Sequence, residues 1–189
     1  TRIVIIPSVN TGSLRPPGRP YEIALDKGQT YQVQGVENLS GTTLEAMDGK
    51  KIAVFCGARQ AFVNKQECDE IVADNHLYEQ ITPLQYASTE FLYVPIAKRG
   101  GDPISRRAGT ENKSIDFNGQ VVKKLNKGAF DTLVTTATLI TSNNPLLIAQ
   151  FSKSAGCFKN PDSTSAGDPS MFYMQPTSVA GKNESFYTP

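Results

Sequence analysis

The chain contains one short apolar run that occurs twice, and this repeat limits the folds that the chain can adopt. The first copy is Lys51-Ile52-Ala53-Val54-Phe55-Cys56-Gly57, and the second is Leu147-Ile148-Ala149-Gln150-Phe151-Ser152. Each run is too short for a typical helix and ends in a small residue, which predicts a buried β-strand. Ile, Ala and Phe stand at matching positions in both copies, so we expect an internal duplication.

Further pairs of segments recur in the same order around these two runs. Asp26-Lys27-Gly28 is matched by Asn126-Lys127-Gly128, and Glu90–Pro95 is matched by Glu184–Pro189. Loops that differ in length between persistent strands explain the small shifts in spacing. We therefore expect a first β repeat unit over residues 1–96 and a second over residues 97–189.

The remaining sequence predicts short strands separated by turns. We expect strands at 2–6, 21–25, 30–34, 42–47, 51–56, 77–81, 91–96, 114–117, 121–125, 130–134, 139–141, 146–151, 171–174 and 186–187. Turns are expected at Asp48-Gly49, Asn118-Gly119 and Asn143-Asn144-Pro145. Long loops are expected at 8–20, 58–75, 97–111 and 152–169, with a short helix near 67–72. This pattern predicts an all-β fold of two antiparallel β-sandwich-like units packed in tandem, with a β-propeller as the alternative.

Charge excludes two classes of partner. Nineteen Lys and Arg against eighteen Asp and Glu give a formal charge of +1. This balance provides no electrostatic basis for binding nucleic acid or an anionic membrane. No apolar run approaches the length of a membrane span. The chain does not begin with Met and has no signal-peptide pattern, so we expect it to be processed or to be part of a longer protein.

The sequence provides no recognisable set of catalytic residues. His76 is the only histidine, and neither a nucleophile elbow nor a phosphate-binding glycine loop is present. A zinc site is disfavoured because the three cysteines include no C-x-x-C pair. We therefore predict a protein that is not an enzyme, with no catalytic residues, no metal site and no cofactor. Calcium stays open because carboxylates cluster at Glu67, Asp69, Glu70 and Asp74.

Cysteines and glycosylation sequons help to indicate the cellular compartment in which the protein works. Cys56 and Cys68 are close enough in sequence to form a disulfide, which would contribute about 3 kcal/mol on the chain-entropy estimate. The alternative is that these two residues and Cys157 are buried thiols. Acceptor triplets for N-glycosylation begin at Asn38, Asn112 and Asn183. Disulfides and N-glycans both belong to the extracellular space or the cell surface.

A basic loop is the candidate partner-binding segment. Lys98, Arg99, Arg106 and Arg107 fall within the expected loop 97–111. Such a set is able to engage sulfated glycans or an acidic partner, although basic residues in a long loop are commonly just solvated. Because β scaffolds carry recognition in their loops, we expect binding at 8–20, 58–75 or 97–111 rather than on a strand.

The order of several segments resembles a known family. They are Lys27-Gly28-Gln29-Thr30-Tyr31, Leu39-Ser40-Gly41-Thr42, Lys51–Gly57, Cys68, Tyr78–Pro83 and Phe91–Pro95, followed by Gly167–Met171 and Gln175-Pro176. This succession is similar to the N-terminal domain of the IgG-Fc-binding protein family and covers most of the chain. The insert between Cys56 and Cys68 departs from the family pattern. The resemblance implies an extracellular, non-catalytic module of secreted, mucin-associated or adhesive proteins, joined to neighbouring modules.

Two other functions follow from the residues alone. A carbohydrate-binding β-sandwich would expose aromatic side chains, for which the candidates are Tyr21, Tyr31, Tyr86 and Phe62, although the chain has no Trp. A carboxylate-dependent hydrolase needs two facing carboxylates, and the sequence places no such pair. We therefore expect a protein or glycan ligand at the cell surface, in the extracellular matrix or in mucus.

Overall fold

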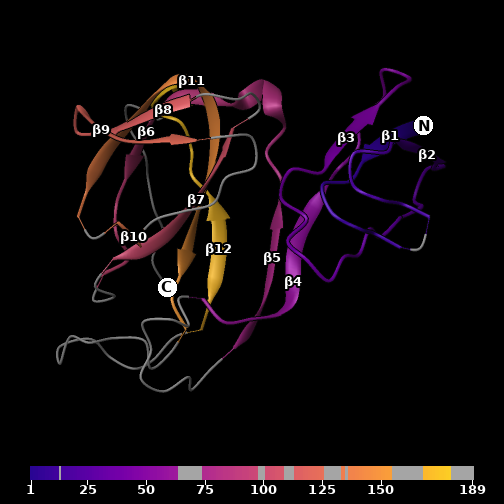
Figure 1. Ribbon diagram of the computed structural model, residues 1–189, viewed down its shortest axis with the longest axis horizontal. Coiled ribbons are helices and arrows are strands. Elements are labelled where there is room, and N and C mark those ends of the chain that lie inside the picture. The colour runs from indigo at the N-terminus through magenta and orange to yellow at the C-terminus, as the bar shows by residue number, and fades with distance from the viewer. Residues whose placement is uncertain are drawn as a thin grey trace. The chain divides into compact units, whose positions relative to one another are not determined.

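The computed structural model shows β-strands as the main regular structure among the residues that it describes. The described residues are 1–12, 14–63, 74–97, 101–108, 113–125, 133–134, 136–154 and 168–179. Among them are twelve strands and two short 3-10 helices, with no α-helix (Figure 1). The all-β prediction is therefore confirmed. The chain divides into two compact units, Thr1–Val54 and Phe55–Pro189.

The first unit is a three-stranded antiparallel sheet. Its strands are β1 (Arg2–Ile6), β2 (Tyr21–Ala24) and β3 (Thr43–Ala46), in the order β2-β1-β3. The central strand buries Ile3 and Ile5. Because β1 is the apolar strand of this unit, both neighbours pair with it. The prediction that 21–25 forms a hairpin with a strand at 30–34 is wrong, since residues 30–34 have no strand.

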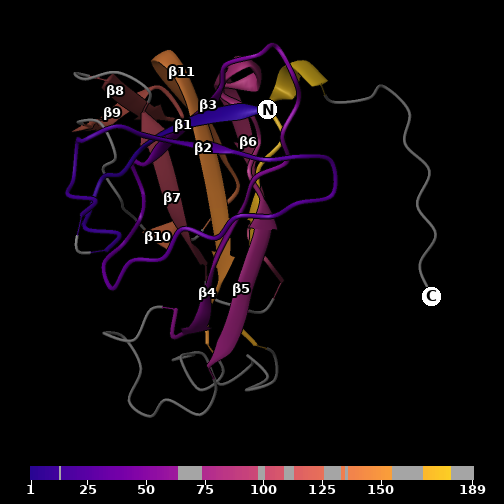
Figure 2. The ribbon, with the colours of Figure 1, turned by 90° about the vertical axis from the view of Figure 1, so that its right-hand side faces the viewer.

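The apolar run at 51–57 is divided between the two units. Asp48-Gly49 forms the expected turn, and Gly49 has a φ of +64°. Residues 51–54 have no strand, however, and β4 covers Phe55–Ala61. β4 pairs with β5 (Asn75–Gln80) and not with β3, which lies at the edge of the first sheet and pairs with β1. Figure 2 shows β4 and β5 side by side.

One long strand organises the second unit. β11 (Thr138–Ser152) pairs with β6 (Ser88–Tyr93), β7 (Asp102–Ala108), β8 (Lys113–Phe117) and β12 (Ser170–Tyr173). β9 (Gln120–Leu125) pairs with β8, and β10 (Leu133–Val134) pairs with β7. The hairpin predicted at Asn118-Gly119 is confirmed, with positive φ angles at both residues.

A turn was expected at Asn143-Asn144-Pro145, but β11 continues through these residues. The irregularity caused by proline, which has no N–H to donate, is absorbed as a register shift against β6 between Thr141 and Leu146. Side chains support the backbone here. Asn143 Oδ1 accepts a hydrogen bond from Ser114 N at 3.1 Å.

The loop expected over 97–111 is wrong over residues 102–108, which form β7. Gly101 has a φ of +92°, and Asp102 starts the strand with a fully buried side chain. A polar segment that contains Gly and Pro therefore forms a strand. Hydrogen bonds from residues on other strands hold the first residue of this strand in place.

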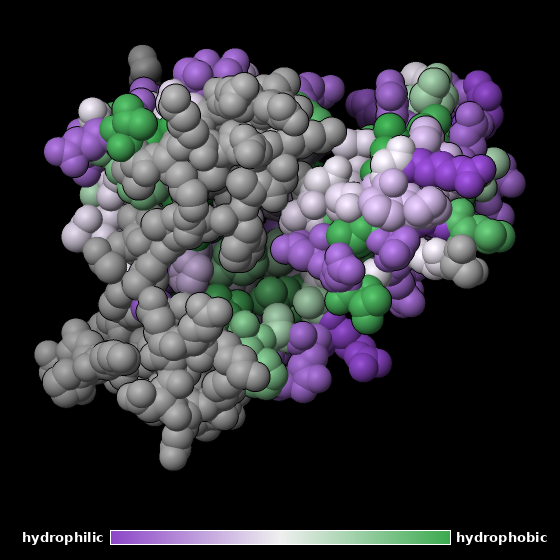
Figure 3. All heavy atoms as spheres, in the orientation of Figure 1, coloured by the Kyte–Doolittle hydropathy of each residue, from purple (hydrophilic) through white to green (hydrophobic). Residues whose placement is uncertain are grey.

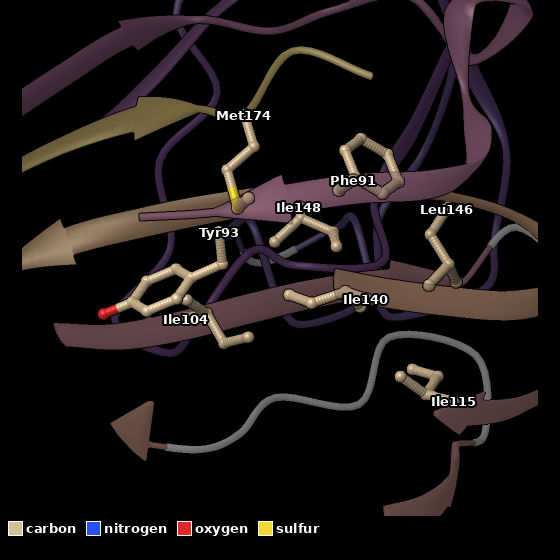
Figure 4. Packing of buried hydrophobic residues seen from close by; sticks show 8 residues of the cluster. All are labelled: Phe91, Tyr93, Ile104, Ile115, Ile140, Leu146, Ile148 and Met174. Carbon is tan, nitrogen blue, oxygen red and sulfur yellow. The ribbon is translucent and has the colours of Figure 1, made fainter. Parts of the chain in front are cut away.

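Buried side chains from several paired strands form one core. Figure 4 shows its eight residues: Phe91, Tyr93, Ile104, Ile115, Ile140, Leu146, Ile148 and Met174. They come from β6, β7, β8 and β11, with Met174 directly after β12. The expected boundary between 96 and 97 lies between β6 and β7, and both of these strands pair with β11. The sequence duplication itself stays a prediction.

Candidate functional site

A groove in the second unit is the candidate site. It has a volume of about 480 Å³, within the range of about 300–1,000 Å³ typical of small-molecule sites. One wall is the connection from β5 to β6, which includes the 3-10 helix η2 (Leu84–Tyr86). The other wall is the segment after β12, which includes the 3-10 helix η3 (Thr177–Val179). The two short helices are seen at the top of Figure 2.

Local hydrogen bonds fix both walls. In η2, Pro83 precedes the helix with a preset φ of −58°, and its carbonyl accepts from Tyr86 N at 2.9 Å. In η3, Val179 N donates to the Pro176 carbonyl at 3.1 Å. The walls are also tied to β6, because Pro176 forms a β-bridge with Phe91.

The groove lining mixes polar and apolar residues and includes no charged side chain among the described residues. Its polar side chains are Gln80, Thr82, Gln85, Tyr86, Ser88, Gln175 and Ser178, and its apolar ones are Ile81, Pro83, Ala87, Pro176 and Val179. The nearby carboxylate of Glu90 accepts a hydrogen bond from Thr177 Oγ1 at 2.6 Å. The described lining can therefore exchange neutral hydrogen bonds with a ligand but provides no counter-charge.

A buried polar network lies elsewhere, where β6, β7 and β11 meet. Asp102 Oδ2 accepts hydrogen bonds from Tyr93 Oη at 3.0 Å, Ile96 N at 2.7 Å and Gln150 Nε2 at 2.8 Å. Burial, followed by the Asp102 carboxylate, raises the pKa of Tyr93 well above its usual value near 10. All three side chains are buried, so the network holds strands together and does not reach a ligand.

Aromatic side chains also line the outer face of the β4–β5 pair. Phe55 and Tyr78 are stacked with ring centroids 5.1 Å apart, and His76 stacks on Tyr78 at 5.7 Å. Gly57 pairs with Tyr78, and a Cβ added at Gly57 would lie 1.8 Å from the Leu77 carbonyl oxygen. His76 is exposed, as expected of a surface histidine. Figure 3 shows further hydrophobic atoms exposed near β12 and β5.

In the first unit, a cation covers two of the predicted aromatic candidates. The Arg15 guanidinium lies 4.3 Å from the ring centroid of Tyr21 and 5.7 Å from that of Tyr31. Its Nη1 also donates to Tyr31 Oη. Arg15 belongs to the loop expected at 8–20, so this contact pins the loop to β2.

The predicted disulfide and glycosylation residues are described only in part. Cys56 is half-buried with its Sγ 3.9 Å from Tyr173 Oη, whereas Cys68 and Cys157 lie outside the described residues. Asn38 is exposed, and its Oδ1 accepts from Ser40 N at 2.9 Å. Asn112 and Asn183 lie outside the described residues. The disulfide and the glycans stay predictions.

In the described part of the chain, the basic and acidic candidate residues do not come together in one site. Arg106 and Arg107 are on strand β7, opposite Ile148 and Leu147 of β11, while Lys98 and Arg99 are outside the described residues. Of the acidic cluster, only Asp74 is described, and it accepts a hydrogen bond from Gln60. Within the described part of the chain, no group of three or more His, Cys, Asp and Glu is arranged to hold a metal ion.

Sequence reasoning named one residue of the groove and missed the others. Tyr86 was an exposed-aromatic candidate, and its side chain is exposed in the groove. The three glutamines and the two 3-10 helices were missed because Gln carries no periodic signal. The groove also joins segments about ninety residues apart.

Comparisons with known proteins give one match. A family model described as IgGFc binding protein matches residues 1–189, the whole chain. Neither a search of curated proteins nor a search of solved structures returns a match. No helix among the described residues has both the length and the apolar character needed to cross a membrane.

Proposed function

Because the chain belongs to the IgG-Fc-binding protein family, we propose that it is a non-catalytic binding module of a secreted or cell-surface protein. The observation that carries this proposal is the family match over the whole chain. An all-β scaffold with long connections, in which binding residues are commonly carried by loops, is consistent with it. The buried position of the Asp102 network also supports a structural rather than a catalytic role for these residues.

The proposed partner is a protein, and the family description makes the Fc region of immunoglobulin G the first partner to test. Adhesion within mucus or extracellular matrix, next to other modules of a longer chain, is part of the same proposal. The basic set Lys98, Arg99, Arg106 and Arg107 is the predicted protein-binding segment. A ligand held by these cations should bind less tightly as the salt concentration rises.

The proposal extends to three structural features of the chain. We propose a disulfide between Cys56 and Cys68, N-glycans at Asn38, Asn112 and Asn183, and a duplication relating residues 1–96 to 97–189. Asn38 supports the glycan proposal because its side chain is exposed. No cofactor is proposed, and calcium binding by the acidic cluster stays a prediction that equilibrium dialysis with calcium can test.

Binding is tested with the 189-residue chain made through a secretory pathway. The chain is immobilised and exposed to Fc fragments, to Fab fragments and to serum albumin. We expect saturable binding of Fc alone, weakened in a variant with all four basic residues changed to Ala. Equal binding of all three proteins, or of none, would overturn the Fc proposal.

The compartment is tested by intact mass before and after reduction and enzymatic deglycosylation. A loss of glycan mass, and two thiols that react with an alkylating reagent only after reduction, are expected. Native material whose mass does not change with glycosidase and which has three alkylatable thiols would contradict secretion.

A further inference from the structure

The groove between η2 and η3 combines one exposed aromatic ring with three exposed glutamine amides, and no charged side chain belongs to its described lining. We propose that this groove binds an uncharged saccharide, with the face of Tyr86 against a sugar ring and the glutamine amides on its hydroxyls. This is a second binding function, separate from the protein ligand proposed above.

The amides carry the first step of the argument. Gln80, Gln85 and Gln175 all line the groove, and all three residues are exposed. Each amide offers donors and an acceptor, and each sugar hydroxyl is also both donor and acceptor. Paired hydroxyls on a sugar ring therefore match the lining without any change of protonation.

The aromatic ring carries the second step. Tyr86 is 58% exposed and stands on the groove wall, so its apolar face is open to a ligand. Several other exposed aromatic rings of the described residues contact protein side chains. Tyr78 stacks with Phe55 and His76. Arg15 covers Tyr21. Tyr86 thus combines an exposed ring with a position on the wall of a groove.

Because the described lining has no charged side chain, the groove should prefer neutral sugars to charged ligands. A sulfated, sialylated or phosphorylated ligand would find no cation among the described lining residues. A proline-rich peptide is also a poorer match, because grooves for such peptides are lined by several aromatic side chains and this one has only Tyr86 in its described lining. The chemistry therefore favours an uncharged ring with vicinal hydroxyls.

The groove is also held in shape before a ligand arrives. Thr177 Oγ1 donates to Glu90 Oε1, and Pro176 bridges to Phe91 of β6, whose side chain is in the core. Walls that are fixed in this way lose little conformational entropy when a ligand binds.

The test uses the full chain on an array of neutral, sialylated and sulfated oligosaccharides, followed by titration calorimetry with the best ligand. We expect neutral glycans to bind, with a Kd that changes little between about 50 and about 500 mM NaCl because no ion pair is formed. Tyr86→Ala should weaken binding about tenfold, and Gln175→Ala should weaken it by a smaller factor.

Tyr78→Ala is the matched control, because Tyr78 is 59% exposed and lies outside the groove lining. Circular dichroism confirms that each variant is folded. The proposal is overturned if no neutral glycan binds, if charged glycans bind in a salt-dependent way instead, or if Tyr86→Ala and Tyr78→Ala weaken binding equally. Binding of a proline-rich peptide that depends on Tyr86, with no neutral glycan bound, would also overturn it. Fc binding is measured with separate reagents, so its failure and the failure of glycan binding are distinguishable.

Discussion

Replacing Asp102 should unfold much of the second unit, because one of its oxygen atoms satisfies three donors. Oδ2 accepts from Tyr93 Oη, Ile96 N and Gln150 Nε2 at 2.7–3.0 Å. These donors lie on β6, just after it and on β11, while Asp102 begins β7. The side chains of Asp102 and Tyr93 are fully buried, so water cannot easily replace the lost acceptor.

The size of the effect follows from counting unpaired donors. Asp102→Ala leaves three donors without an acceptor at about 1–3 kcal/mol each, or about 3–9 kcal/mol in total. That loss is comparable with the whole free energy of unfolding of a typical domain, about 5–15 kcal/mol. Tyr93→Phe removes one donor and the acceptor of Asp102 N, and should cost about 1–3 kcal/mol.

Asp102→Asn separates charge from hydrogen bonding. Oδ1 has no partner in the structure, so an amide NH2 can occupy that position while the amide oxygen keeps all three bonds at the position of Oδ2. Weaker neutral hydrogen bonds then oppose the lower cost of burying an uncharged group. We expect a net loss of only about 0–2 kcal/mol.

The assay is urea unfolding followed by circular dichroism, together with hydrogen exchange at the Ile96 amide, which donates directly to Oδ2. Exchange at Ile96 should become fast in Asp102→Ala and stay slow in Asp102→Asn. The reasoning fails if Asp102→Ala is as stable as the parent chain, or if Asn costs more than Ala. It also fails if Ile96 exchange does not respond to either change.

Three other predictions concern pH and glycine geometry. The raised pKa of Tyr93 means that folding favours the neutral form of this side chain. The resulting stabilisation is complete below the unfolded pKa near 10 and is lost as the pH rises above it. The free energy of unfolding should therefore fall in alkaline solution, and it should fall less in Tyr93→Phe. Gly57→Ala would place a Cβ 1.8 Å from the Leu77 carbonyl oxygen, and urea unfolding should show a loss of more than about 2 kcal/mol. Gly119→Ala meets no atom within 4 Å but keeps a φ of +82°, so it should cost only about 1–2 kcal/mol of backbone strain; a larger loss at Gly119 than at Gly57 would contradict both assignments.

Local sequence patterns predicted the strands and turns that depend on neighbouring residues. Asn118-Gly119 is an example, because both residues tolerate the positive φ that a tight hairpin needs. The strand at 2–6 was also predicted, since a short run rich in Ile and Val is a strand signal in itself. The family assignment likewise came from short segments in a recognisable order and is confirmed.

Patterns failed where a distant group compensates for an unfavourable local sequence. Pro145 predicts an interruption, yet β11 continues because Asn143 supplies a side-chain acceptor to β8 and the register shift removes the need for an N–H. Gly101-Asp102-Pro103 predicts a loop, yet Tyr93 and Gln150 bond to the Asp102 carboxylate and fix the start of β7.

The amino-acid sequence by itself determined the β character of the chain, its hairpin turn and its family, because backbone preference and side-chain alternation act over a few residues. Only the tertiary structure decided which strands pair, that Asp102 is buried, and that Tyr86 and Gln175 line one groove. These features depend on groups far apart in the chain, and their free energies are realised only after the strands have come together.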